Sequence, residues 1–339
     1  MVGHLALLNI LFSLQLQLLF VFQIGLKNCR KTLDQMSNMQ QNQIAAASDL
    51  PKNKLLDIVN SRYLAMAICI ANKKKLAYVI TPEKPVSVEE IAKSLYCSEN
   101  MLYRFLSYLA AYGIFEEKDN RSFQGNDISQ AMREDIPNNC HHMLLAHGSR
   151  PQWKATIHMD LLLDVPEPPT PFESVTGLSF YDYLAANPDD QKNFDFGIKN
   201  ATVSWQQSVP DYYDFSPYSS IVDLAGGCGG LLKAILEKNP KVTGTLFEAP
   251  SVLKNVIPEL FSNERFRAVP GDFCKDIDVA ADIYTVAVTL HCFNDSRLSV
   301  ILANIAKAMK FKSGSKLLIL EVDYEKTIVP NTPSGQRTV

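Results

Sequence analysis

Residues 221–230 read IVDLAGGCGG, in which apolar residues and one aspartate are followed by four glycines. Apolar, β-forming side chains before a run of small residues predict a strand that ends in a turn. Successive glycines are costly inside regular structure, so this turn requires unusual backbone angles or close approach of the backbone to a ligand. The next residues, LLKAILEKN at 231–239, have helical spacing and predict a helix directly after the turn.

Strand-like and helix-like segments continue to alternate beyond this turn. Further strands are predicted at 243–250, 266–273, 281–290 and 315–323, and further helices at 251–260 and 296–310. This alternation predicts an α/β fold with a parallel sheet, right-handed crossovers and helices on both faces. Open sheets of this kind bind ligands at the carboxyl ends of their strands, where the glycine turn is expected.

An acidic residue indicates what the turn binds. Glu248 ends the next predicted strand, 25 residues after Asp223, and a carboxylate there can accept hydrogen bonds from both hydroxyls of a ribose. The dinucleotide fingerprint fails because Leu231 and Leu232 stand where its last glycine belongs, and a P-loop fails because Lys233 does not follow a glycine. The remaining candidate ligand is a nucleoside without phosphates. Asp223 is then placed to contact a charged group next to that nucleoside.

Composition narrows the class of protein. The formal net charge is -3 and the isoelectric point is about 6.1, which provides no overall attraction to nucleic acid. The seven cysteines form no C-x-x-C pair, which fits a reducing compartment such as the cytoplasm. His141 and His142 are adjacent and cannot share one helical face, so no metal site is predicted.

The first 53 residues are predicted to lie outside the folded body. Residues 5–26 carry no charge and are long enough to cross a hydrocarbon core of about 30 Å, although polar residues interrupt the run. Basic residues follow directly at 27–31 and would leave the body on the cytoplasmic side if the run inserts. The alternatives are an amphipathic surface segment or an extension without a role in the fold. A polar linker is predicted at 36–53.

Residues 54–135 have the order of a winged-helix domain. Ser87 and Glu90 form a predicted capping box, a second helix ends at Gly113, and a hairpin follows. Such an order suits either DNA binding or dimerisation. The second helix carries one arginine, Arg104, among apolar and aromatic side chains, so dimerisation is favoured and nucleic acid is not expected as a partner. Residues 136–219 form an aromatic-rich helical connector that is predicted to line a pocket for a flat substrate.

These motifs resemble a known family when taken in order. VDLAGGCGG, FEAP at 247–250, GDF at 271–273, LHCFND at 290–295 and LLILEV at 317–322 are similar to the successive motifs of class I S-adenosylmethionine-dependent O-methyltransferases. The nearest group is the dimeric one typified by acetylserotonin and caffeate O-methyltransferases. The resemblance runs from about Lys54 to Glu321. It implies a Rossmann-like methyltransferase domain at 220–339, preceded by a winged-helix-like dimerisation domain.

The resemblance also implies a role for each matching residue. The methionine part of the cofactor is assigned to Asp223, Gly226, Gly227 and Gly229, the ribose to Glu248, the adenine to Asp272 and Phe273, the general base to His291, and the acidic residue beside it to Glu321. The implied reaction is methylation of a hydroxyl group on a small aromatic acceptor. A phenol has a pKa near 10, and a histidine with a pKa near 6.5 can accept its proton at neutral pH.

The chain departs from the family pattern in three places. Cys292 and Phe293 stand where the family commonly has Asp and Trp, and Ala287 stands where relatives often carry a lysine. The family also continues further beyond Glu321 than this chain, which ends at Val339, so a C-terminally shortened domain is expected. The alternative to an active enzyme is therefore a weak or inactive paralogue that binds the cofactor or acts through its dimerisation domain.

Overall fold

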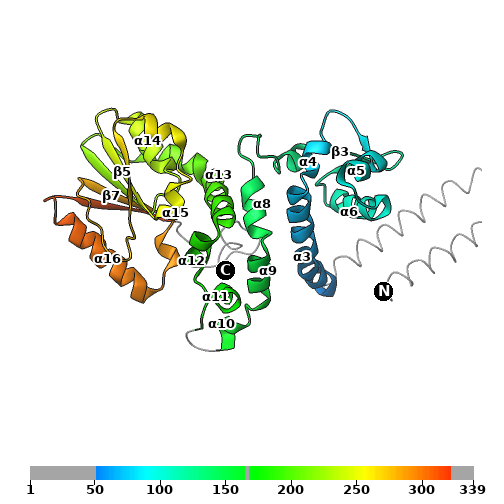
Figure 1. Cartoon of the computed structure of the whole chain (residues 1–339), viewed down its shortest axis with the longest axis horizontal. Helices are drawn as coiled ribbons and strands as arrows, with labels where there is room; N and C mark the ends of the chain where they lie inside the picture. Colours follow the sequence, from blue (N-terminus) through cyan, green and yellow to red (C-terminus); the bar gives the residue numbers. More distant parts are fainter. Residues whose placement is uncertain (1–50, 165–167, 322–339) are drawn as a thin grey trace, which may run out of the picture. The chain divides into compact units, whose positions relative to one another are not determined.

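The computed structural model describes residues 51–164 and 168–321 (Figure 1). The chain divides into two compact units, Met1–Ala65 and Met66–Val339. The apolar run at 5–26 and the C-terminal residues 322–339, where a shortened domain is expected, lie outside the described residues.

A long helix, α3 (Pro51–Lys73), begins in the first unit and ends in the second. Its early turns expose a set of large apolar side chains, namely Leu55, Leu56, Ile58, Val59 and Tyr63. By length and composition alone, α3 could cross a membrane. An exposed apolar surface on a helix also suits burial against a second copy of the chain, which is the role predicted for this region.

The winged-helix order is confirmed in the second unit. Three helices, α4 (Leu76–Val79), α5 (Val88–Leu95) and α6 (Glu99–Ala111), accompany an antiparallel sheet in the order β1 (Val86–Ser87), β3 (Ser122–Gln124), β2 (Glu116–Lys118). Ser87 caps α5 through the Glu90 N–H, and the Glu90 side chain accepts from the Ser87 N–H, so the predicted capping box is present. Gly113 has a φ of 72° just after α6, which ends that helix as predicted.

Helices make up the connector that leads to the parallel sheet. After α7 (Asp127–Gln130), which belongs to the preceding domain, they are α8 (His141–His147), α9 (Arg150–Ile157), α10 (Leu161–Asp164), α11 (Pro171–Thr176), α12 (Phe180–Ala186) and α13 (Pro188–Tyr212). The longest, α13, packs closely on α8 at Gly197, where a Cβ would lie 3.0 Å from the backbone of Met143. This close approach fixes which face of α13 points away from α8.

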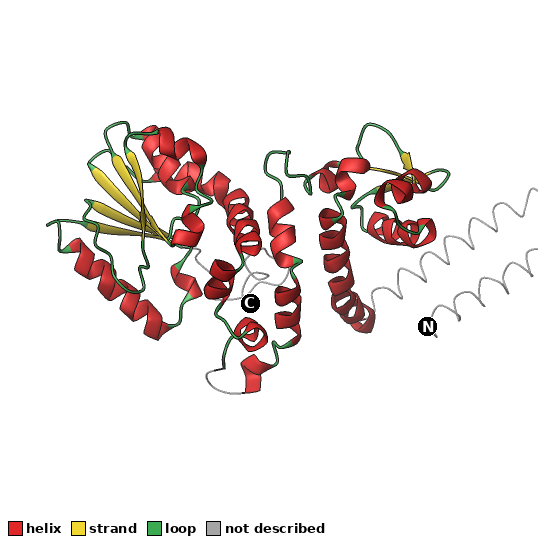
Figure 2. Ribbon diagram, viewed as in Figure 1, coloured by secondary structure: helices red, strands yellow, loops and turns green. Residues whose placement is uncertain are grey.

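The predicted parallel sheet is confirmed (Figure 2). Its strands are β4 (Ser220–Leu224), β5 (Thr243–Glu248), β6 (Phe266–Pro270), β7 (Ile283–Ala287) and β8 (Lys316–Leu320), in the order β6-β5-β4-β7-β8. Helix α14 (Gly230–Lys238) packs on one face and α16 (Asp295–Met309) on the other, as Figure 1 shows. Because β4 is central, the turn that follows it lies at the middle of the carboxyl edge.

The strands predicted at 243–250 and 266–273 end two and three residues early, and two other predicted elements are interrupted for a local reason. The helix expected at 251–260 is replaced by a short helix, α15 (Pro250–Leu253), and a 3₁₀ turn, η1 (Pro258–Ser262). Pro258 lacks the N–H that a continuous helix would need at this position. The strand expected at 281–290 ends at Ala287 because Val288 adopts a φ of 49°, which lies outside the extended region.

Candidate active site

The glycine turn bends sharply between β4 and α14. Ala225, Gly227 and Gly229 have positive φ angles of 53°, 59° and 83°. Glycine adopts such angles without steric cost, which accounts for two of the three residues. Gly226 is needed for a different reason, because a Cβ there would collide with the Asp223 carboxylate. The turn therefore lies directly against Asp223, and at Gly227 an added Cβ would meet no atom within 4 Å.

Asp223 lies beneath this turn and not at its surface. Its side chain is 0 % exposed, and its Oδ1 accepts a hydrogen bond of 2.6 Å from the Thr285 hydroxyl on β7. The other oxygen, Oδ2, has no hydrogen-bond partner in the described part of the chain. Burial raises the pKa of Asp223 to about 7, since only one hydrogen bond favours the charged form. This buried, half-satisfied carboxylate makes the turn a favourable place for positive charge.

Glu248 closes the other side of the turn from the end of β5. Its Oε2 accepts from the Gly227 N–H at 2.9 Å, and its Oε1 accepts from the Ala249 N–H at 2.7 Å. Burial raises the pKa of Glu248 to about 7 despite these two hydrogen bonds. The carboxylate is thus fixed at the turn, where the sequence predicts the ribose.

The predicted adenine residues follow β6. A Cβ at Gly271 would collide with the Phe247 ring, so only glycine allows the chain to turn here. Asp272 caps its own loop through the Cys274 N–H (2.9 Å) and pairs with Lys275 (3.1 Å). The Phe273 ring contacts Phe293 edge to face, with ring centroids 5.7 Å apart. Phe293, one of the departures from the family pattern, therefore supports the predicted adenine region.

The structure brings His291 and Glu321 together at the ends of β7 and β8. His291 lies in a 3₁₀ turn, η2 (Leu290–Cys292), and its Nδ1 lies 2.9 Å from Glu321 Oε2. Glu321 Oε1 also accepts from the backbone N–H groups of Thr289 (2.9 Å) and Leu290 (2.8 Å). Partial burial raises the pKa of Glu321, but these hydrogen bonds outweigh it and hold the pKa below its usual value.

This geometry determines the tautomer of the imidazole. A carboxylate only accepts hydrogen bonds, so Nδ1 must donate, and the neutral ring then keeps its lone pair on Nε2. Among the described residues, none hydrogen-bonds Nε2, and the side chain is 42% exposed. Val288 begins the loop that carries His291, and its N–H donates to Leu320 at 2.7 Å despite a φ of 49°. A β-branched residue in this conformation is strained, which is typical of a functional site.

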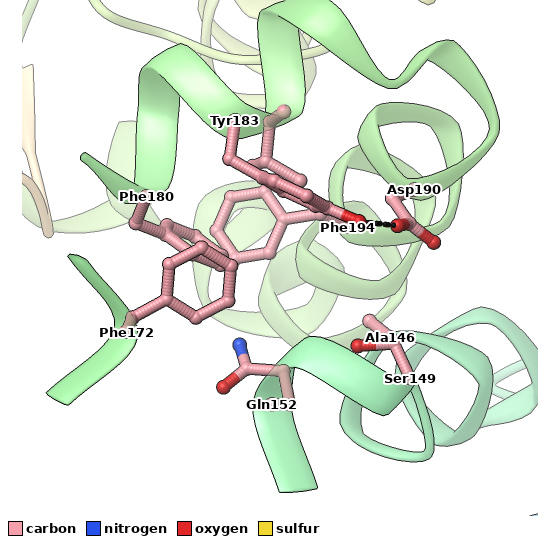
Figure 3. Close-up of a pocket in the computed structure, with 9 residues that line it drawn as sticks. Ala146, Ser149, Gln152, Phe172, Phe180, Tyr183, Asp190 and Phe194 are labelled. Atoms are coloured by element: carbon pink, nitrogen blue, oxygen red, sulfur yellow. Dashed lines mark hydrogen bonds between the residues drawn. The ribbon is translucent and has the colours of Figure 1, made fainter. Parts of the chain in front are cut away.

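An aromatic wall extends from this site into the connector. The Tyr181 hydroxyl lies near the Cys292 thiol, and burial together with this neighbour raises the pKa of Tyr181. Figure 3 shows a cavity lined by Phe172, Phe180, Tyr183 and Phe194, with the Tyr183 hydroxyl donating to Asp190 at 2.8 Å. Its volume of about 10 Å³ is that of about one water molecule, so the cavity is too small for an aromatic ring unless these side chains move.

One carboxylate at the site was missed by the sequence reasoning. Asp195 on α13 is 7% exposed, and burial raises its pKa to about 6. Its oxygens accept from the side-chain amides of Gln191 and Asn255, each at 2.8 Å. Its backbone oxygen accepts from the Cys228 thiol of the glycine turn at 3.7 Å. Two signals were available: Asp195 stands among aromatic side chains in NFDFG (193–197), and it belongs to residues 180–200, which resemble the family's segment that enters the substrate pocket.

The charges of the site fit the predicted cofactor. Asp195, Asp223 and Glu248 accept hydrogen bonds from amide, hydroxyl and backbone N–H groups, and no ion pair involves them in the described ranges. Uncompensated buried carboxylates are costly, so the site favours a cationic ligand. S-adenosylmethionine, with a sulfonium, an ammonium and a carboxylate, meets that requirement. Within residues 51–164 and 168–321, no cluster of His, Cys, Asp or Glu could hold a metal ion.

Comparisons with known proteins identify the family of the chain. Residues 159–336 match the O-methyltransferase domain family, and residues 56–135 match the O-methyltransferase dimerisation domain. Phenazine O-methyltransferase of Lysobacter antibioticus is 30% identical over 84% of this chain and 82% of its own length. Phenazine-1-carboxylate N-methyltransferase of Pseudomonas aeruginosa is 26% identical over 87% of this chain and 84% of its own. The structure of the mitomycin 7-O-methyltransferase superposes with a TM-score of 0.77 at 26% identity, covering 84% of each chain.

Proposed function

The chain belongs to the O-methyltransferase family, and on that premise we propose that it methylates a hydroxyl group of a small aromatic acceptor, with His291 as general base. The observation that carries this proposal is the 2.9 Å contact between His291 Nδ1 and Glu321, which leaves Nε2 as a solvent-accessible proton acceptor. A phenol needs to lose its proton as it attacks a methyl group, and a fixed imidazole can take it.

The cofactor of the family is S-adenosylmethionine. When bound, it supplies an electrophilic methyl group on a sulfonium and leaves as neutral S-adenosylhomocysteine. In our proposal the backbone of Gly226, Gly227 and Gly229 receives the methionine part, with Asp223 supporting the turn from below. Glu248 accepts from the ribose hydroxyls, and Asp272 and Phe273 hold the adenine. The hydrogen bonds that Glu248 makes now fix its carboxylate at the edge of the turn.

His291 and Glu321 act together in the proposed reaction. His291 Nε2 accepts the phenol proton while the acceptor oxygen attacks, and the Glu321 carboxylate stabilises the imidazolium that results. Cys292 leaves no carboxylate next to His291 in the sequence, so orientation of the ring depends on Glu321. Little further chemistry is required of the protein beyond in-line positioning of the acceptor.

A base favours a hydroxyl acceptor over an amine. An N-methyltransferase occurs among the relatives, but a neutral amine already carries the lone pair that attacks and does not need to be deprotonated first. The oriented His291–Glu321 pair therefore supports O-methylation. The aromatic side chains of α11, α12 and α13 support a flat acceptor, held edge to face as their own rings are now.

We further propose that residues 54–135 dimerise two copies of the chain, that 136–219 connect to the catalytic domain, and that 220–339 form that domain. The match to the O-methyltransferase dimerisation domain and the exposed apolar face of α3 support a homodimer. A cytoplasmic location is proposed for the body of the protein, in keeping with the cysteines that stay unpaired among the described residues.

His291→Ala tests the proposed base. Transfer of a labelled methyl group to a panel of phenols should fall by about 10²- to 10⁴-fold, the usual contribution of a general base. Affinity for S-adenosylhomocysteine, measured by calorimetry, should stay within about twofold, since His291 is not assigned to the cofactor. The exposed His158→Ala is the matched control. Undiminished transfer would rule out the base, and cofactor binding without any transfer by the wild type would favour the inactive paralogue.

A further inference from the structure

We propose that Asp195 is a positioning residue for the positive charge of the methyl donor, and that it makes the site prefer the cationic donor to its neutral product. The inference rests on the proposed function, because it presumes that the glycine turn and Glu248 hold S-adenosylmethionine. It adds a residue outside the methyltransferase motifs and assigns it a measurable selectivity.

Asp195 reaches the cofactor site from the connector and contacts it twice. Its backbone oxygen accepts from the Cys228 thiol in the turn itself, and its Oδ2 accepts from Asn255 in the loop that follows the Glu248 strand. The third contact, from Gln191, lies one turn earlier on α13 and holds the other oxygen. The two amide contacts fix the carboxylate, and the backbone contact holds this part of α13 against the turn.

The position of Asp195 matches the position of the sulfonium in the chemical structure of the donor. The sulfur atom joins the methionine part to the ribose, so its charge lies between the turn and Glu248. The Asp195 backbone contacts the turn at Cys228, and its carboxylate accepts from Asn255, which lies beyond the strand that ends at Glu248. Its charge also contributes to the raised pKa of Glu248. A carboxylate at that junction acts mainly on the sulfonium and less on the two ends of the ligand.

The charge of Asp195 is not neutralised within the protein. Its two side-chain partners are neutral amides. Helix α13 carries two lysines, Lys192 and Lys199, whose ammonium groups lie 5.7 and 5.4 Å from the centre of the Phe196 ring, and neither forms an ion pair with a described residue. A unit charge several Å from a carboxylate, in surroundings of effective dielectric about 20, changes an equilibrium constant by a factor on the order of ten or more.

Comparing the binding of the donor with that of its product separates this electrostatic effect from effects of side-chain packing. S-adenosylmethionine and S-adenosylhomocysteine differ only in the methyl group and the charge that it confers on the sulfur. Asp195→Asn removes the charge and keeps the size, and a flip of the Gln191 or Asn255 amide restores the hydrogen bonds. Asn255→Ala removes one partner but keeps the charge, and the exposed Asp189→Asn makes the same charge change on the same helix away from the site.

Calorimetry at a pH of about 8, where the carboxylates are ionised, should then show a selective loss. Asp195→Asn should weaken binding of S-adenosylmethionine by about tenfold and binding of S-adenosylhomocysteine by less than about threefold. Asn255→Ala and Asp189→Asn should keep the wild-type ratio of the two affinities. Thermal unfolding checks that each variant is folded. If Asp195→Asn does not fold, Asp195→Ser serves as a second neutral variant.

Equal weakening for both ligands in the neutral Asp195 variants would overturn the inference and leave the cofactor site intact. A changed ratio in Asn255→Ala, where the charge is retained, would overturn it as well. Failure of the wild type to bind either ligand would overturn the proposed function and this inference with it.

Discussion

Replacing Glu321 by Gln isolates the electrostatic part of the proposed base. The amide oxygen can still accept from the Thr289 and Leu290 N–H groups, which now donate to Oε1 at 2.9 and 2.8 Å. At His291, however, an amide N–H replaces the carboxylate oxygen that lies 2.9 Å from Nδ1. Two donors cannot share this contact, so the imidazole must place its lone pair on Nδ1 and its proton on Nε2.

The expected loss follows from these contacts. A hydrogen bond to a charged group contributes about 1.5 to 3 kcal/mol, which corresponds to roughly ten- to a hundredfold in rate. A wrong tautomer in a buried Ser-His-Asp triad costs up to about 10⁴. The His291 side chain is 42% exposed, so water can hydrogen-bond its ring nitrogens. The loss of rate should therefore be smaller than in the buried triad. We expect kcat to fall by about a hundredfold, with thermal stability nearly unchanged.

Two measurements test the reasoning. Methyl transfer from labelled S-adenosylmethionine reports the rate, and ¹⁵N NMR of the imidazole reports its tautomer without need of an acceptor. The exposed Asp278→Asn variant of the neighbouring loop serves as the control. A Glu321→Gln enzyme that works within about threefold of wild type, or a His291 that keeps its proton on Nδ1, would refute the account.

Two further predictions concern stability and assembly. Burial raises the pKa values of Asp223 and Glu248 to about 7, whereas in the unfolded chain they lie near 4. Their contribution to the free energy of unfolding is therefore greatest below pH 4 and is lost as the pH rises through 7. Denaturation of the cofactor-free protein between about pH 4.5 and 8 should show a smaller decline for Glu248→Gln than for wild type, and parallel curves would contradict this. For assembly, light scattering should find a dimer that Leu55→Glu with Ile58→Glu converts to a folded monomer, since both side chains are exposed on α3. A persisting dimer would exclude this face, and Glu89→Ala is the control.

The sequence predicted those parts of the site that depend on backbone geometry. The turn at 226–229 needs glycine for its φ angles and for its contact with Asp223. This requirement can be recognised in the sequence as a run of glycines. Glu248 and His291 follow predicted strands, and ends of parallel strands meet at one edge. The fold was predictable for the same reason, because the alternation of strands and helices leaves few topologies.

What the sequence did not predict depends on contacts between distant segments. Asp195 belongs to the site only because α13 packs with that face toward the turn, and nothing in its local sequence specifies this packing. The strain at Val288 is equally hidden, since valine is a strong strand former. Proline interrupted the helix predicted at 251–260, although Pro258 was itself a signal that could have been used.

The closeness of Phe194 and Asp195 on one helix limits how the protein can change. Successive helical residues point about 100° apart, so Phe194 lines the aromatic cavity while the Asp195 side chain contacts Asn255 and its backbone contacts the glycine turn. Gly197 locks the rotation of the helix against Met143. A single inserted or deleted residue in this turn would move both side chains off their targets at once. Substitutions in α11 and α12 can therefore reshape the aromatic cavity one side chain at a time, whereas a change in the length of α13 would disturb the cavity and the turn together.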